Sequence, residues 1–230
     1  SGADHPAAAR AHGMDGDRPM SRSGLSGMPR VGQDGRVPVL DLSPRIVYRR
    51  PRGNPGSATG WSAQVGPVLD AARWVGTVLP PADILGSLVL PVVSFTGASA
   101  RVRSGLGPML DLETLDVWET MPTDQTPTAP LRIVGFIATA TRWSTAVEQV
   151  RSLAGLGAGL VVTTSARSSL SLLDADATGV WVVGAPPCEP GPRLWVTGRV
   201  GPAATATRVT ATRIMEESLF AHALHHDLVR

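Results

Sequence analysis

Hydrophobic and polar positions follow their clearest pattern between residues 131 and 230. Three apolar runs, LRIVGFIATA, AGLVVTTS and GVWVVG, have the length and composition of buried strands. Two segments between them, RWSTAVEQVRSLAGLG and ARSSLSLLDADA, have the apolar spacing of amphipathic helices. Strand, helix, strand, helix, strand is the order of a mainly parallel sheet with right-handed crossovers, so we expect an α/β sandwich of two or three layers.

Two further elements complete this half of the chain. LWVTGRV is expected to form an antiparallel hairpin with GVWVVG at one edge of the sheet, and IMEESLFAHALHHDLV a last helix. We expect Ser144 to cap the first of the two amphipathic helices, and Thr163, Thr164 or Ser165 to cap the second, because hydroxyl oxygens accept hydrogen bonds from the first exposed amides.

Residues 61–130 carry a different mixture of elements. Residues 61–79 predict a single helix that ends at Pro80 and Pro81, with one apolar face formed by Val65, Val68, Leu69, Ala72, Val75 and Leu79. The run ILGSLVLPVVSF is too short to span a bilayer, which favours a buried strand or core helix over a membrane contact.

Residues 107–124 predict a short acidic helix. Its apolar edge consists of Leu112, Leu115 and Trp118. Its carboxylates are Asp111, Glu113, Asp116 and Glu119. Two interpretations stay open: a surface helix whose apolar edge joins the core, and a docking strip for a basic partner or for the N-terminal arm. The proline-rich loop TDQTPTAP follows, and we place the main internal boundary there.

The N-terminal segment differs in composition from the rest. Residues 1–35 are rich in Gly, Ser, Pro, Asp and Arg without periodicity, which predicts a flexible arm. RVPVLDLSPRIVYRR then predicts short strands at a sheet edge, where proline is tolerated. The expected organisation is an arm (1–35), edge strands with the apolar helix and acidic strip (36–130), and the α/β core with its C-terminal helix (131–230).

Charge divides the chain in the same way. All 21 basic residues are arginines, and they face 19 acids. Residues 1–60 hold nine arginines and five acids, whereas residues 61–130 hold three arginines and seven acids. The first section is therefore net positive and the second net negative. Attraction between a basic segment of one copy and the acidic section of another is a route to self-association.

Cysteine content and the N-terminus bear on the compartment. Cys188 is the only cysteine, so no disulfide within the chain can form. The first residues contain no apolar run of the kind found in a signal peptide. We therefore expect a cytoplasmic protein without a membrane span, and the sequence calls for no cofactor.

Metal and nucleophile motifs are incomplete. His222 and His226 stand one helical turn apart and are the only metal candidates, but a third ligand is missing, so a solvated helix end is the favoured interpretation. Ser165 follows a buried strand, yet it lacks both a G-x-S-x-G turn and a nearby histidine. These gaps favour a protein that is not an enzyme.

The glycine run GLGAG at residues 155–159 precedes a strand, whereas a dinucleotide fingerprint follows one. AGLVVTTS followed by an edge hairpin resembles the late strands of RecA-like ATPases. The chain has no lysine and so no phosphate-binding loop of that family, and the resemblance implies at most a non-hydrolysing relative.

Three functions compete on these observations. The leading hypothesis is a non-catalytic protein-interaction or assembly module that uses the basic arm and the acidic strip. The second is a binding site or enzyme for an anionic or phosphorylated small molecule at the carboxyl ends of the parallel strands. Its candidate residues are Thr139, Thr141, Arg142, Thr163, Thr164, Ser165 and Arg167. The third is nucleic-acid association through the arm and Arg45, Arg49, Arg50 and Arg52, residues that serve equally as protein-partner contacts.

Overall fold

The structure is a computed structural model that describes residues 65–122, 124–203 and 210–229. All of them belong to the unit that runs from Leu42 to Arg230. The predicted arm (1–35), the predicted edge strands near residues 36–50 and the four arginines from Arg45 to Arg52 lie outside the described residues.

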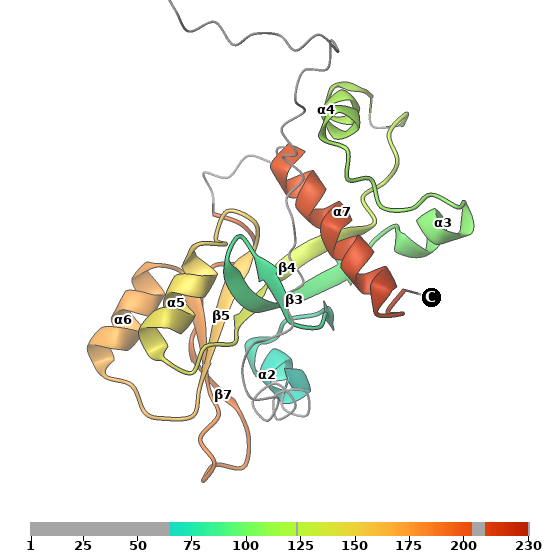
Figure 1. The fold of residues 1–230 in the computed structure, drawn as a ribbon. Helices are drawn as coiled ribbons and strands as arrows, with labels where there is room; N and C mark the ends of the chain where they lie inside the picture. Colours follow the sequence, from blue (N-terminus) through green and yellow to red (C-terminus); the bar gives the residue numbers. More distant parts are fainter. Residues whose placement is uncertain (1–64, 123, 204–209, 230) are drawn as a thin grey trace, which may run out of the picture. The chain divides into compact units, whose positions relative to one another are not determined.

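One mixed sheet of seven strands organises the described chain into an α/β fold (Figure 1). The strands are β1 (Thr77–Val78), β2 (Ala82–Ile84), β3 (Ser87–Phe95), β4 (Leu131–Ala138), β5 (Ala158–Thr163), β6 (Val180–Gly184) and β7 (Arg193–Val196). Their order is β1-β3-β4-β5-β6-β7, and β2 pairs with β3. The strands predicted from the second half of the chain, including the edge hairpin of β6 and β7, are confirmed.

More of the strand pairs in the sheet are antiparallel than we expected. Only the β4–β5 and β5–β6 pairs are parallel, and the other four pairs are antiparallel. The difference arises in β1, β2 and β3, which add to β4 as antiparallel strands. The turn between β2 and β3 has positive φ at both Leu85 (51°) and Gly86 (81°), as a two-residue type I′ hairpin turn requires. The apolar run through Val92 and Val93 is a buried strand, as predicted.

Helices cover both faces of the sheet. They are α2 (Val65–Ala72), α3 (Ala98–Arg103), α4 (Leu112–Thr120), α5 (Trp143–Arg151), α6 (Ser169–Ala177) and α7 (Thr210–His225). Helices α5 and α6 pack on the face that carries Val161 and Val182, and α7 joins the same face through Phe136. Helix α2 packs on the opposite face, against Leu160 and Trp181. The arrangement of helices on both sides corresponds to the three-layer alternative.

The helix predicted for residues 61–79 is shorter than expected at its C-terminal end. Helix α2 stops at Ala72, because Arg73 takes a positive φ of 55° and the chain then turns into β1. Val75, predicted on the apolar face, is 87% exposed. Trp74 instead enters the core, where its ring meets that of Trp181 edge to face at a centroid distance of 6.1 Å.

The predicted caps were wrong for both crossover helices. Arg142 occupies the N-cap of α5 and makes no side-chain capping bond, so Ser144 already lies within the helix. Ser168 caps α6 by accepting a hydrogen bond from the amide of Ser171 at 3.2 Å. The hydroxyl of Thr163 turns inward instead and bonds within its own loop.

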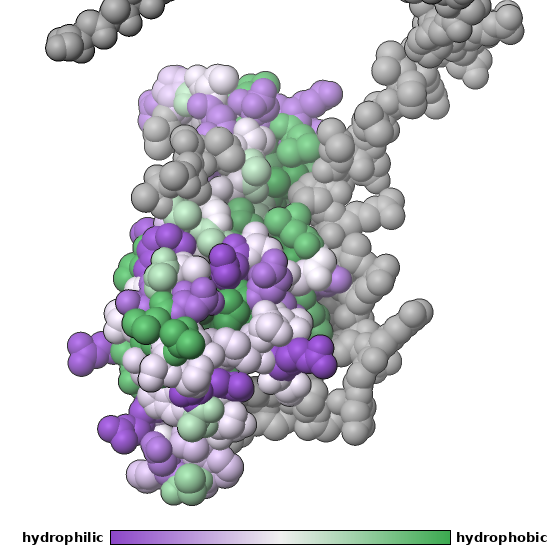
Figure 2. Space-filling model, turned by 90° about the vertical axis from the view of Figure 1, so that its left-hand side faces the viewer, coloured by the Kyte–Doolittle hydropathy of each residue, from purple (hydrophilic) through white to green (hydrophobic). Residues whose placement is uncertain are grey.

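Helix α7 is the most deeply buried helix of the fold, since 10 of its 16 residues are buried. None of the helices in the described part of the chain has the length and apolar character needed to cross a membrane. On the face formed by α5 and α6, hydrophobic side chains lie in small patches between polar ones (Figure 2). The most exposed apolar side chains of α6 are Leu170 and Leu173.

Candidate functional site

A buried ion cluster joins α7 to the segment that carries α3 and α4. The carboxylate of Glu217, fully buried, accepts from both terminal nitrogens of Arg101 at 3.0 and 3.2 Å. Arg213 approaches the same carboxylate at 3.2 Å, and the backbone amide of Met109 donates to it at 3.0 Å. Four donors thus converge on one carboxylate, which compensates for its removal from water.

The arginines of this cluster also bind loop carbonyls. Arg101 donates to the carbonyl oxygen of Gly107 at 2.7 Å, and Arg213 donates to that of Pro127 at 2.8 Å. The guanidinium of Arg213 lies 5.8 Å from the ring centre of Trp118. The cluster therefore fixes both loops that flank α4.

Helix α4 forms as predicted, and its two sides differ. Asp111 is its N-cap and accepts hydrogen bonds from the amide and the hydroxyl of Thr114, which lower the pKa of the Asp111 carboxyl. Leu115 is fully buried, and Leu112 and Trp118 are half-buried. The three predicted partner contacts thus form the side of α4 that packs within this chain.

The other side of the segment faces solvent. All four predicted carboxylates, Asp111, Glu113, Asp116 and Glu119, are exposed. The same segment exposes five apolar side chains: Val102, Leu106 and Leu110 before the first of these carboxylates, and Val117 and Met121 in and after α4. We call the outward side of residues 98–121 the acidic surface. Helix α4 itself contains no arginine.

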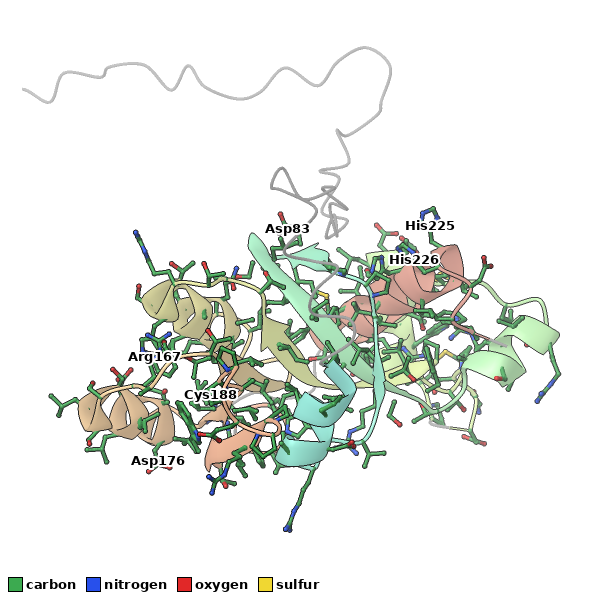
Figure 3. The ribbon with its side chains drawn as sticks, turned by 90° about the horizontal axis from the view of Figure 1, so that it is seen from below. Asp83, Arg167, Asp176, Cys188, His225 and His226 are labelled. Atoms are coloured by element: carbon green, nitrogen blue, oxygen red, sulfur yellow. The ribbon has the colours of Figure 1, made fainter. Side chains whose placement is uncertain are left out.

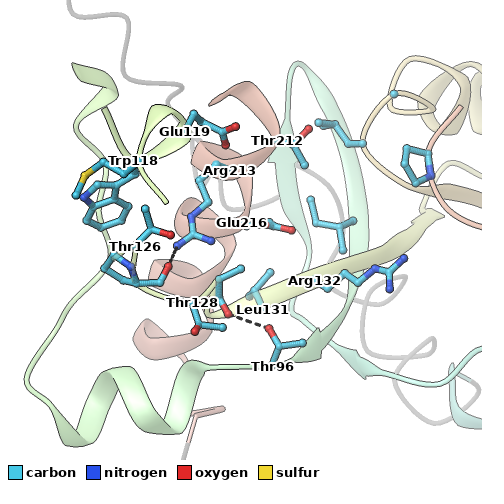
Figure 4. Close-up of a pocket in the computed structure, with 17 residues that line it drawn as sticks. Thr96, Trp118, Glu119, Thr126, Thr128, Leu131, Arg132, Thr212, Arg213 and Glu216 are labelled. Carbon is cyan, nitrogen blue, oxygen red and sulfur yellow. Dashed lines mark hydrogen bonds between the residues drawn. The ribbon is translucent and has the colours of Figure 1, made fainter. Parts of the chain in front are cut away.

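A cavity of about 660 Å³ opens beneath the acidic surface (Figure 4). Helix α4 contributes Trp118 and Glu119 to its wall, and α7 contributes Arg213 and Glu216. Arg132, from the start of β4, lines the opposite side. Because Glu119 and Glu216 line the cavity together with Arg132 and Arg213, its charged lining carries both signs, and apolar side chains form much of the rest.

A second cavity, of about 710 Å³, is mainly apolar and lies beside α2. Trp74, Trp181, Leu194 and Val200 are among its lining residues. Neither cavity is lined by the residues predicted at the carboxyl ends of the parallel strands.

Those predicted residues nevertheless come together in part. Arg167, which follows β5, donates from Nε to the hydroxyl of Thr163 at 2.9 Å, and its guanidinium lies 5.1 Å from the ring centre of Trp143, which follows β4. Thr139 is used elsewhere, since its hydroxyl donates to the carbonyl of Leu88. The remaining candidates, Thr141, Arg142, Thr164 and Ser165, are exposed.

The chain matches no protein-family model, and comparison with curated proteins and with solved structures gives no match either. Any function must therefore be inferred from the arrangement of the side chains themselves.

The histidines at the end of α7 lie close together without forming a metal cluster. His225 and His226 are neighbours at this end of the helix (Figure 3), and the rings of His222 and His226 are 4.7 Å apart. The ring of His222 contacts the carbonyl oxygen of Pro80 at 3.1 Å. Within residues 65–122, 124–203 and 210–229, no three His, Cys, Asp or Glu side chains are arranged so that they could hold a metal ion. Cys188 is exposed.

The ion cluster was missed by sequence reasoning. Its partners lie 116 positions apart in the chain, so no local spacing reveals them. The available signal was the pair Glu216 and Glu217 between the apolar residues Ile214, Met215, Leu219 and Phe220, since a carboxylate on a buried helix requires partners.

Proposed function

We propose that this chain is a non-catalytic protein-interaction module that assembles through its acidic surface. The observation that supports the proposal is the mixture of exposed carboxylates and exposed apolar side chains on one segment. Five of the 12 large hydrophobic residues that are exposed in the described chain fall within residues 102–121. Exposed apolar groups gathered next to charged ones are typical of surfaces that bind other proteins.

The anchoring of this segment also supports an interaction role. Glu217, Arg101 and Arg213 hold both ends of α4, and Leu115 packs beneath it. A surface that is ordered before binding loses little conformational entropy when a partner arrives. The acidic surface is therefore pre-organised, and Asp111 contributes to its order as the N-cap of α4.

The partner expected for this surface is a segment rich in arginine with apolar residues between the charges. The chain supplies one in RVPVLDLSPRIVYRR and the adjoining Arg52, within a section of net positive charge. A second copy of the chain is the occupant that we propose. Charge complementarity of this kind increases the association rate and determines which surfaces meet.

Light scattering on the full-length chain tests the proposal. We expect a mass above that of the monomer at micromolar concentrations, and a lower mass as salt is added. Replacing Glu113→Gln and Val117→Ser together removes one charge and one apolar group from the acidic surface. This variant should be monomeric under the same conditions.

The matched control lies on α6, where Leu173→Ser and Asp174→Asn change the same two chemistries at exposed positions. The control should assemble like the unaltered chain. Substituting glutamine for Arg45, Arg49, Arg50 and Arg52 should abolish assembly. A chain that stays monomeric throughout, or a Glu113/Val117 variant that assembles normally, would rule out the proposal.

A further inference from the structure

The edge of the sheet at the carboxyl ends of β4 and β5 contains a second arrangement, independent of the acidic surface. Because these two strands are parallel neighbours, the loops that follow them lie at the same edge. The contact between Arg167 and Trp143 joins the two loops. Arg167 lies beside the ends of α5 and α6 (Figure 3).

Arg167 is held in a defined orientation. Its Nε donates to Thr163, whose own side chain is only 3% exposed, and its guanidinium lies over the indole of Trp143. These contacts do not use the two terminal nitrogens of Arg167, which form no hydrogen bond or ion pair with any described residue. An arginine fixed at Nε and on one face presents these two nitrogens together, which suits two oxygens of one anion.

The two loops that meet at Arg167 carry arginine but no acid. The stretches from Thr139 to Thr145 and from Thr163 to Ser169 contain two arginines, Arg142 and Arg167, and no acid. The carboxylate in the loop after β6, Glu189, approaches Arg193 at 3.9 Å. The acids of α6, Asp174 and Asp176, lie towards its opposite end.

Hydroxyl groups surround this positive charge. The exposed side chains of Thr141, Ser144, Thr164 and Ser165 belong to the same two loops or to the first turn of α5. Hydroxyls donate to the oxygens that a guanidinium leaves unbound, and phosphate offers more such oxygens than a carboxylate does. We propose that this edge binds a phosphate group, with Arg167 as the main ligand and Arg142 as the second cation.

The test uses the full-length chain labelled with ¹⁵N and titrated with inorganic phosphate. The indole N–H resonance of Trp143, assigned through a Trp143→Phe variant, reports directly on the proposed site. We expect this resonance to shift saturably as phosphate is added. Arg167→Gln should weaken phosphate binding about tenfold or more, because it removes a charge-assisted hydrogen bond.

The control is Arg151→Gln, which removes the same charge from the other end of α5. It should change phosphate affinity by no more than about twofold, because screening at ordinary salt weakens the effect of a distant exposed charge. The amide spectrum of each variant reports whether its fold is intact. An equal loss in Arg151→Gln would indicate general electrostatic attraction and overturn the proposal, as would an unsaturable shift at Trp143.

Two further titrations distinguish a phosphorylated organic ligand from free phosphate, and phosphate from a carboxylate. Phenyl phosphate that binds more tightly than inorganic phosphate would identify a phosphorylated organic ligand, whereas equal affinity would identify the free ion. Acetate serves as the carboxylate probe. If acetate binds as tightly as phosphate, the assignment to phosphate is wrong.

Discussion

The carboxylate of Glu217 on α7 is bound by both terminal nitrogens of Arg101 on α3, across 116 positions of the chain. Both side chains are buried, at 0% and 5% exposure. Such a pair has a large desolvation cost, and its mutual attraction offsets that cost only when the geometry is good. The paired geometry, with Arg213 and the amide of Met109 completing the set, meets this condition.

Glu217→Gln is therefore expected to destabilise the fold. The substitution keeps the shape of the side chain but removes the negative charge that both terminal nitrogens of the buried Arg101 face. Loss of one partner from a buried pair typically costs about 3–5 kcal/mol. The free energy of unfolding, measured by urea denaturation, should fall by an amount in this range.

Glu148→Gln on the exposed side of α5 is the control for this substitution. Its effect should stay within about 0.5 kcal/mol, as for most surface changes. If Glu217→Gln were also that mild, the ion cluster would contribute nothing to holding α3 and α4 on α7.

The parallel core was predictable from sequence because its signals are local. LRIVGFIATA, AGLVVTTS and GVWVVG are apolar runs of strand length separated by helices of the right period, and each became a strand. The acidic helix near Leu115 was equally clear. The sequence could not show whether the apolar edge of α4 packs within the chain or binds a partner. That choice depends on contacts between α4 and α7, which are distant in sequence.

Other elements were missed for identifiable reasons. The hairpin between β2 and β3 turns at Leu85 and Gly86, and leucine gives no sequence signal for a turn that needs positive φ. The sequence predicted a helix through Val75 because the helical spacing of apolar residues continues past Arg73. The helix nevertheless ends before Arg73, which takes a positive φ. The contact of Arg167 with Trp143 was within reach of sequence reasoning, since both residues follow neighbouring parallel strands.

Leu85→Asn should stabilise the protein. Leu85 takes a φ of 51° with its side chain exposed, so it contributes little packing and holds a backbone conformation that asparagine tolerates better. We expect the free energy of unfolding to rise by up to about 1 kcal/mol, because the left-handed conformation costs an ordinary side chain about 1–2 kcal/mol and asparagine relieves part of that cost. Thermal denaturation would show a higher midpoint, and a lower midpoint would mean that the Leu85 side chain makes a contact that matters.

Gly135→Ala should have the opposite effect. A Cβ at this position in β4 would lie 2.5 Å from Cη2 of Trp74 and would also collide with the carbonyl oxygen of Ala158. Forcing extra atoms into a packed core costs about 1–3 kcal/mol, and here one of the obstacles is backbone. Urea denaturation should show a loss in this range or larger.

Gly155→Ala is the control for Gly135→Ala. A Cβ at Gly155 meets nothing within 4 Å, and φ there is not in the left-handed region. Alanine at such a position restricts the unfolded chain, so stability should be unchanged or rise by up to about 1 kcal/mol. Equal losses in both variants would show that Trp74 does not pack as described.

Stability should fall as pH is lowered through the range in which histidine titrates, and His222 should be one cause. Burial lowers the pKa of His222, the contact with Pro80 opposes this shift, and His226 and His225 add to it. A histidine with a lowered pKa in the folded state is protonated first in the unfolded state, so unfolding takes up a proton below about pH 6.5. The stabilising contribution is complete above that pH and is lost as pH falls towards the lowered pKa of folded His222.

Urea denaturation between about pH 7.5 and about pH 5.5 should show the free energy of unfolding falling with pH, and His222→Gln should make this dependence on pH weaker. An unchanged slope in His222→Gln would assign the dependence to other groups.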